Sequence, residues 1–198
     1  MNSKTVINNL LWRFLERIGA QGVHLIVSII LARILAPEVY GTIALVTVFT
    51  TIMQVFIDSG LGTALIQKKD ADDLDFSTVF YFNLLMCIVL YGVMFIVAPF
   101  IAKFYEIPDL TSIVRVLSLT LVVSGVKGIQ QSYVSKKLQF KKLFFSTLGS
   151  TFISAAVGIY MAYKGYGVWA LVGQTLSSNI VGTVIMWITV KWRPKLMF

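Results

Sequence analysis

Cysteine and histidine are almost absent from this chain, with one residue of each among 198. The single cysteine, Cys87, cannot form a disulfide within the chain, and its apolar surroundings in the sequence suggest no redox role. One cysteine and one histidine cannot supply the four ligands of a structural zinc site. The sequence therefore predicts neither a disulfide framework nor a bound metal, and it indicates no other cofactor.

Catalytic motifs are missing as well. The sequence contains no nucleophile elbow, phosphate-binding loop, CxxC or HExxH pattern, and a lone histidine leaves little for acid–base chemistry. The one cluster of acids, at Asp70, Asp72, Asp73 and Asp75, adjoins two lysines, which favours a solvated loop over an active site. We therefore predict that the chain is not an enzyme.

Charged residues are scarce, at 13%, whereas 57% of the chain is hydrophobic and the mean hydropathy is +0.82. This composition excludes an ordinary soluble domain. Apolar runs long enough to span a bilayer recur along the chain, and most basic residues lie between them, so the net charge of +8 indicates membrane orientation rather than nucleic-acid binding. The first apolar stretch contains charges and lacks a small-residue cleavage site, so no signal peptide is expected.

We predict an all-α polytopic membrane protein, with a bundle of six transmembrane helices forming a single lobe over residues 1–198. Pro37 should end the first span, because proline cannot continue the helical hydrogen bonds. Gly60 and Gly62 permit a turn or a short interfacial helix after the second span, and Pro99 marks a kink or the end of the third. The expected spans are residues 10–35, 40–58, 76–102, 110–131, 143–163 and 168–190.

The distribution of basic residues predicts the orientation. With the N-terminus inside, ten basic residues outside the spans fall on the cytoplasmic side and three on the other side. Both termini should therefore be cytoplasmic in a multi-pass protein of the cell inner membrane. The cytoplasmic ten are Lys4, Lys68, Lys69, Lys136, Lys137, Lys141, Lys142, Lys191, Arg193 and Lys195, and the other three are Arg33, Lys103 and Lys164.

Polar residues follow one face of the first span. Arg13, Arg17, Gln21 and His24 recur at helical spacings, and Ser28 extends the stripe. Such residues are costly in a membrane unless they face water or a partner. We therefore predict that this stripe lines a hydrated, substrate-binding cavity.

The second span repeats the pattern with Thr47, Thr51, Gln54 and Asp58. We expect the two helices to be adjacent, so that both stripes line the same hydrated cavity. Asp58 either pairs with a cation of the first span or caps the helix end at the glycine corner; the sequence leaves both open.

Less specific explanations exist for the same residues. Arg13 and Arg17 can extend to the lipid headgroups, with Glu16 as a partner. His24 can be a hydrogen-bonded core residue. Lys127, in the fourth span, is either an interfacial cation or a further cation of the cavity.

Small and hydroxyl-bearing residues line one face of the fifth span. Close helix packing explains such a face better than substrate contact does. The residues are Thr147, Ser150, Thr151, Ser154 and Gly158. The same packing role is expected for the polar residues of the sixth span, which are Gln174, Ser177, Ser178 and Asn179. Arg115, near the other end of the span that carries Lys127, is expected at the membrane interface.

Four segments of the sequence are similar to a known family. They are LAPEVYG (35–41), DSGLGTALIQ (58–67), DLDFSTVFYFNLL (73–85) and GYGVWALV (165–172). They resemble the oligosaccharide and lipopolysaccharide flippase branch of the multidrug/oligosaccharidyl-lipid/polysaccharide exporter superfamily. The resemblance covers nearly the whole chain but only the N-terminal lobe of the family, whose members have two six-helix lobes.

The resemblance implies a transporter that flips a polyprenyl-diphosphate-linked oligosaccharide across the cytoplasmic membrane for surface polysaccharide assembly. The basic residues of the predicted cavity agree, since they can neutralise a diphosphate. Alternatives are a multidrug or small-cation exporter of the same superfamily and a non-transporting, truncated lobe. Exposed polar stripes on a lone lobe would need a partner, either a missing second lobe or a second copy in a homodimer.

Overall fold

The computed structural model describes residues 3–57 and 61–195, with side chains from residue 11 onward, and all the regular elements in this part of the chain are helices. Six of them are long and apolar enough to cross a membrane, which confirms the predicted all-α bundle. The helices are α1 (Ser3–Ile34), α2 (Pro37–Ile57), α3 (Leu61–Gln67), α4 (Asp73–Phe104), α5 (Leu110–Lys136), α6 (Phe140–Tyr163) and α7 (Val168–Thr189).

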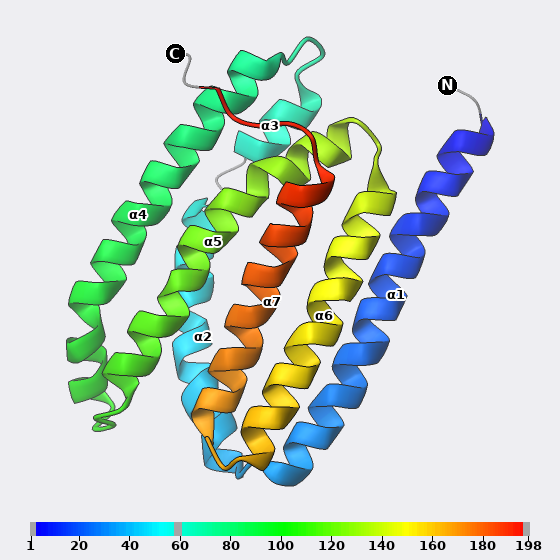
Figure 1. The fold of residues 1–198 in the computed structure, drawn as a ribbon. Helices are drawn as coiled ribbons and strands as arrows, with labels where there is room; N and C mark the ends of the chain where they lie inside the picture. Colours follow the sequence, from blue (N-terminus) through cyan, green and yellow to red (C-terminus); the bar gives the residue numbers. More distant parts are fainter. Residues whose placement is uncertain (1–2, 58–60, 196–198) are drawn as a thin grey trace.

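Five long helices lie side by side in the order α4, α5, α7, α6, α1, and α2 lies behind α5 and α7 (Figure 1). The described ends of the chain, the short helix α3 and the α5–α6 connection are all at one end of the bundle. The α1–α2, α4–α5 and α6–α7 turns are at the other end. We call the first end the terminal end.

The acid cluster forms the start of α4. Asp72 is the N-cap, its side chain accepts a 2.9 Å hydrogen bond from the backbone N–H of Asp75, and the Asp75 carboxylate accepts one from the backbone N–H of Asp72. This capping box satisfies backbone donors of the first turn and places the helix start three residues before the expected span. Asp75 also pairs with Lys68 at 2.6 Å, and that hydrogen bond raises the pKa of Lys68.

Pro99 lies inside α4 and does not end it. Proline has no N–H, so the carbonyl of Phe95, four residues earlier, loses its helical partner. Arg115 of α5 replaces that partner, because its Nε donates to the Phe95 carbonyl at 3.3 Å. The guanidinium also lies 3.9 Å from the centroid of the Phe95 ring. Arg115 thus has a structural role that the sequence analysis did not predict.

Small residues allow α6 and α7 to pack closely. A side-chain Cβ at Gly158 would lie 3.0 Å from Cβ of Gln174, and one at Gly173 would lie 2.5 Å from Sδ of Met161. The serines on this face of α6 are also buried, and Ser146 donates to the carbonyl of Gly182 at 2.8 Å. Because close backbone approach is a main source of helix association in lipid, this seam confirms the packing role predicted for the small-residue face of α6.

The terminal end is joined across several helices. The ammonium of Lys136, at the end of α5, donates to the carbonyl of Leu65 in α3 (3.0 Å) and to that of Lys68, the residue after α3. Trp192, in the segment after α7, is buried against Phe76 of α4 and Tyr133 of α5. These contacts give the short helix α3 a fixed place between α4 and α5, as the glycine corner allowed.

Candidate functional site

The polar stripe of α1 is exposed along the helix. Arg17, Gln21, His24 and Ser28 are all exposed, and Nδ1 of His24 lies 3.3 Å from Oγ of Ser28. Arg17 has no ion-pair partner among the side chains that the structure describes. The stripe therefore faces the surroundings of the bundle rather than its packed interior.

His24 also borders a cavity of about 240 Å³ between α1, α6 and α7. We call it the central pocket. Its lining is almost entirely uncharged and polar, with no lysine, arginine or carboxylate. The lining residues are His24, Val27, Thr151, Ser154, Ala155, Gln174, Thr175, Ser178 and Asn179.

Gln54 borders a second cavity, of about 200 Å³, between α2, α5 and α7. We call it the side pocket, and its lining is again polar and uncharged. The lining residues are Thr50, Thr51, Gln54, Thr120, Leu121, Ser124 and Asn179. Asn179 borders both pockets, so the polar residues of α1 and α2 converge on one position of α7. At about 1.5 Å per residue this position is roughly 15 Å from either end of its helix, near the middle of the span.

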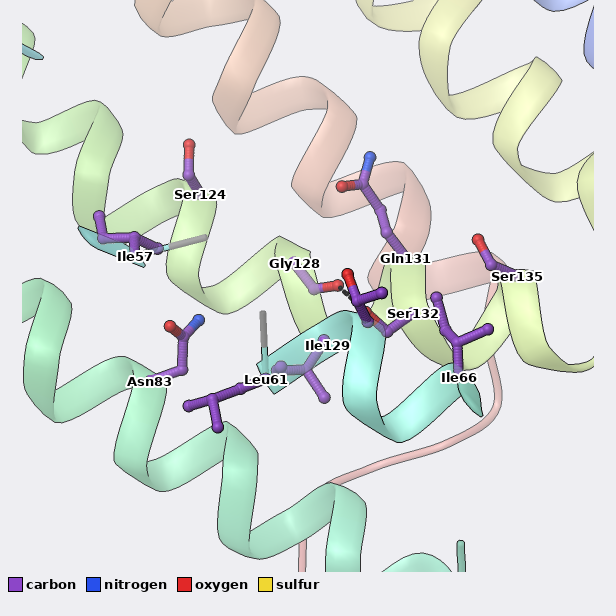
Figure 2. A pocket seen from close by; sticks show the side chains of 12 residues that line it. Ile57, Leu61, Ile66, Asn83, Ser124, Gly128, Ile129, Gln131, Ser132 and Ser135 are labelled. Atoms are coloured by element: carbon purple, nitrogen blue, oxygen red, sulfur yellow. Dashed lines mark hydrogen bonds between the residues drawn. The ribbon is translucent and has the colours of Figure 1, made fainter. Parts of the chain in front are cut away.

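A third cavity, of about 250 Å³, lies at the terminal end between α3, α4 and α5. We call it the interfacial pocket. It shares Ser124 with the side pocket, and Figure 2 shows Asn83 of α4 pointing toward it from one side while Ser132 of α5 lies on the other. Neighbouring pockets thus share one residue each, Asn179 for the central and side pockets and Ser124 for the side and interfacial pockets.

The expected adjacency of α1 and α2 needs correction. They follow one another in the chain, yet α1 packs against α6, whereas α2 packs against α5 and α7, and the two share little contact. The strong packing of α6 on α7 separates them. A polar residue of α1, His24, lines the central pocket, whereas polar residues of α2 line the side pocket, and the two pockets share Asn179.

Charged residues form a separate cluster nearer the terminal end. Nη1 of Arg13 lies 2.8 Å from Oε2 of the buried Glu16, and the Thr147 hydroxyl donates to Oε1 of Glu16 at 2.9 Å. Glu16 is thus the partner of Arg13 that the sequence suggested. Arg13 also lies 5.4 Å from the centroid of the Phe140 ring.

Lys127 lies inside the bundle rather than at its rim. It is half-buried, and a Cβ built on Gly182 of α7 would be 2.9 Å from its Nζ. Among the described side chains, no ion pair joins Lys127 to a carboxylate. We call Arg13, Glu16, Arg17 and Lys127 the charged cluster. Asp58, the remaining predicted site residue, lies outside the described residues.

Several polar residues of the pockets were not predicted as site residues. Asn179, Gln174 and Ser178 were expected to serve helix packing, and Asn83 and Ser132 were not considered. The available signal was the presence of an amide or hydroxyl side chain within an apolar span. In the described part of the chain, no group of three or more acidic, cysteine or histidine side chains is placed to hold a metal ion.

Comparison with known proteins adds to this geometry. The family model described as "Polysaccharide biosynthesis protein" matches residues 30–198. The succinoglycan biosynthesis transport protein ExoT of Rhizobium meliloti is 25% identical over 198 residues, which are 100% of this chain and 40% of that protein. The teichuronic acid biosynthesis protein TuaB of Bacillus subtilis is 28% identical over 156 residues, 75% of this chain and 31% of that protein.

The lipopolysaccharide biosynthesis protein WzxC of Escherichia coli is 25% identical over 132 residues, which cover 67% of this chain and 27% of that protein. The chain thus spans less than half the length of each of these three relatives. No solved structure matches the chain.

Proposed function

Because the chain belongs to the polysaccharide biosynthesis protein family, we propose that it forms one six-helix lobe of a transporter that moves lipid-linked oligosaccharide across the cytoplasmic membrane. The observation that carries the proposal is the pair of polar pockets meeting at Asn179 in the middle of the bundle. Uncharged polar space at that depth suits a polar substrate or water, since lipid cannot hydrogen-bond to it.

The charged cluster supports an anionic lipid carrier. A polyprenyl diphosphate bears negative charge at the membrane interface, and the cluster holds three cations against one carboxylate, on Glu16. Arg17 is exposed and without an ion-pair partner among the described residues, so it is available to a diphosphate. The lipid tail would remain in the bilayer while the head group crosses by alternating access.

A multidrug or small-cation exporter is the second candidate, and the pockets disfavour it. Cationic substrates need carboxylates or aromatic faces. The linings of the central and side pockets contain neither among the residues that the structure describes. The uncharged lining is better suited to sugar hydroxyls.

We further propose that the exposed stripe of α1 and the exposed polar residues of α2 are covered by a second lobe, in the same polypeptide or in a second copy. Arg17, Gln21 and His24 would otherwise face lipid, which is costly. Two copies can meet about a two-fold axis along the membrane normal and bury the same residues on both sides. Cross-linking of single cysteines at positions 24 and 54 tests the second-copy form. A monomer that flips substrate unaided contradicts a second lobe of either kind.

The orientation proposal has its own test. We expect both termini and the terminal end to be cytoplasmic, because basic residues concentrate there. Reporter fusions after residues 69, 138 and 195 should report the cytoplasm, and fusions after 105 and 165 the opposite side. The reverse pattern would contradict the orientation.

Transport itself is tested in vesicles that contain the self-associated chain and a fluorescent undecaprenyl-diphosphate oligosaccharide. We expect flipping, and we expect Asn179→Leu to slow it at least about tenfold, equivalent to ~1.4 kcal/mol on the barrier. Thr183→Val is the matched control, because Thr183 is buried on the same helix and borders none of the three pockets. Vesicles without flipping would contradict the second-copy form, and equal rates for the wild type and Asn179→Leu would contradict the proposal.

A further inference from the structure

Three of the four hydroxyl groups that line the central pocket already donate hydrogen bonds within their own helices. The hydroxyls of Thr151 and Thr175 donate to the carbonyls of Thr147 (2.7 Å) and Leu171 (2.9 Å), within their own helices. Ser154 does the same to the carbonyl of Thr151 at 3.0 Å. A hydroxyl has one proton but two lone pairs, so each of these groups retains only acceptor capacity toward the cavity.

The side-chain amide of Asn179 also donates a hydrogen bond within its own helix. Its Nδ2 donates to the carbonyl of Thr175 at 2.9 Å, which leaves Oδ1 as the group with full capacity for another partner. The side pocket repeats this pattern, because Thr50 and Thr120 donate to carbonyls of their own helices. Donors remain in the central pocket at Gln174, Ser178, His24 and the second N–H of Asn179, so the lining is rich in acceptors without being purely accepting.

This inventory disfavours the diphosphate as the occupant of the central pocket. An ionised diphosphate offers acceptors and no donors, so it would face the oxygens of Thr151, Ser154 and Thr175 without a proton between them. The lining also has no lysine or arginine to offset the charge. A sugar ring is complementary, since each hydroxyl both donates and accepts.

We propose that the central pocket binds the uncharged sugar portion of the substrate, while the charged cluster binds the diphosphate. The inference rests on the proposed function and deepens it by dividing the substrate between two subsites. It selects sugars with free hydroxyl or acetamido groups, because those supply the donors that the acceptors of Thr151, Thr175 and Asn179 require. Acidic sugars are disfavoured, since a carboxylate would meet the same oxygens.

The test measures binding of two lipids to the full chain reconstituted in nanodiscs. One is undecaprenyl diphosphate carrying a neutral disaccharide with an N-acetyl group, and the other is undecaprenyl diphosphate without sugar. The variant Thr151→Val/Thr175→Val removes both acceptors while preserving side-chain shape. Thr183→Val is the control, because the Thr183 hydroxyl makes the same kind of bond, to the carbonyl of Asn179 at 2.8 Å, but borders none of the three pockets.

We expect the double variant to weaken binding of the sugar-bearing lipid about tenfold, the size expected for two lost hydrogen bonds. Binding of the bare diphosphate lipid should change less than about twofold in all variants, since tenfold corresponds to ~1.4 kcal/mol and no contact to that lipid is removed. Equal losses for the two lipids, or no loss, would overturn the inference. So would sodium binding by the wild type that the double variant loses, because acceptor oxygens also suit a bare cation.

The outcomes separate the two proposals. Sugar-selective binding without flipping would refute transport by the self-associated chain and leave the subsite in place. Flipping with unchanged affinity in the double variant would refute the subsite and leave transport in place. A chain that binds neither lipid would refute both.

Discussion

Two surfaces of the bundle are equally exposed and differ in chemistry. On α4 the exposed side chains are apolar, with Ile96 67% and Phe100 69% exposed. On α1 the exposed residues include Arg17, Gln21 and His24. Since a membrane offers hydrocarbon to one surface and only water or protein can satisfy the other, exposure alone does not identify the lipid face. We therefore expect the α4 surface to face lipid and the α1 stripe to have water or protein as its neighbour.

The two sides of the bundle also differ in how closely their helices pack. Cys87 of α4 is fully buried against Gly125 of α5, so this seam is packed without spare volume. On α1, a Cβ at Gly22 would find no atom within 4 Å. Helix positions on the polar side are therefore free to accept added volume, whereas the seam is not.

The largest expected effect comes from adding volume where Gly125 of α5 packs against Cys87 of α4. A Cβ at Gly125 would lie 2.4 Å from Sγ of Cys87, so Gly125→Val should lower the free energy of unfolding by about 3 kcal/mol through overpacking. The matched change on the polar side, Gly22→Val, should be within about 0.5 kcal/mol of the wild type. Unfolding in mixed micelles, followed by tryptophan fluorescence, measures both. Similar losses for the two variants would contradict the difference in packing.

A smaller effect is expected from the buried charge. Glu16→Gln removes the anion that accepts from Arg13 and Thr147, and hydrogen bonds to charged groups are worth about 1.5–3 kcal/mol, so we expect a loss near 2 kcal/mol. Arg17→Gln, one position along on the exposed stripe, should change the free energy of unfolding by less than about 0.5 kcal/mol. A larger loss from Arg17→Gln than from Glu16→Gln would show that Arg17, and not the buried Glu16, supports the fold.

The smallest of these effects concerns the broken helix α4. Arg115→Leu leaves the carbonyl of Phe95 without its donor and should cost about 1 kcal/mol. In a Pro99→Ala background the helix supplies its own N–H to that carbonyl, so the same change should cost less. A double-mutant cycle measures the difference. A cost that is unchanged by Pro99→Ala would show that Arg115 acts through another contact.

Membrane-length helices were predictable because the length of an apolar run, and the proline or glycine residues that end it, are local properties of the sequence. Pro37 and the glycine corner determined the limits of the first two spans. The full extent of α4 was not predictable, since its start depends on the Asp72–Asp75 capping box and its continuation past Pro99 on Arg115, a residue from another helix.

The sequence predicted which kinds of residue form the candidate site, but it did not predict how these residues are arranged in space. Helical spacing identified the α1 stripe, and the charge in the span drew attention to Lys127. The convergence on Asn179 depends on α7 packing between α5 and α6, which spacing within a single helix does not reveal.

The central claim is that the pockets around Asn179 hold water and not lipid. Single cysteines at positions 24, 179 and 96, in a Cys87→Ala background, test it with a small charged thiol reagent applied to the chain in vesicles. Position 96 is the control, since Ile96 is exposed on the apolar α4 surface. We expect rapid modification at 24 and 179 and none at 96. Protection at both 24 and 179, equal to that at 96, would contradict the claim.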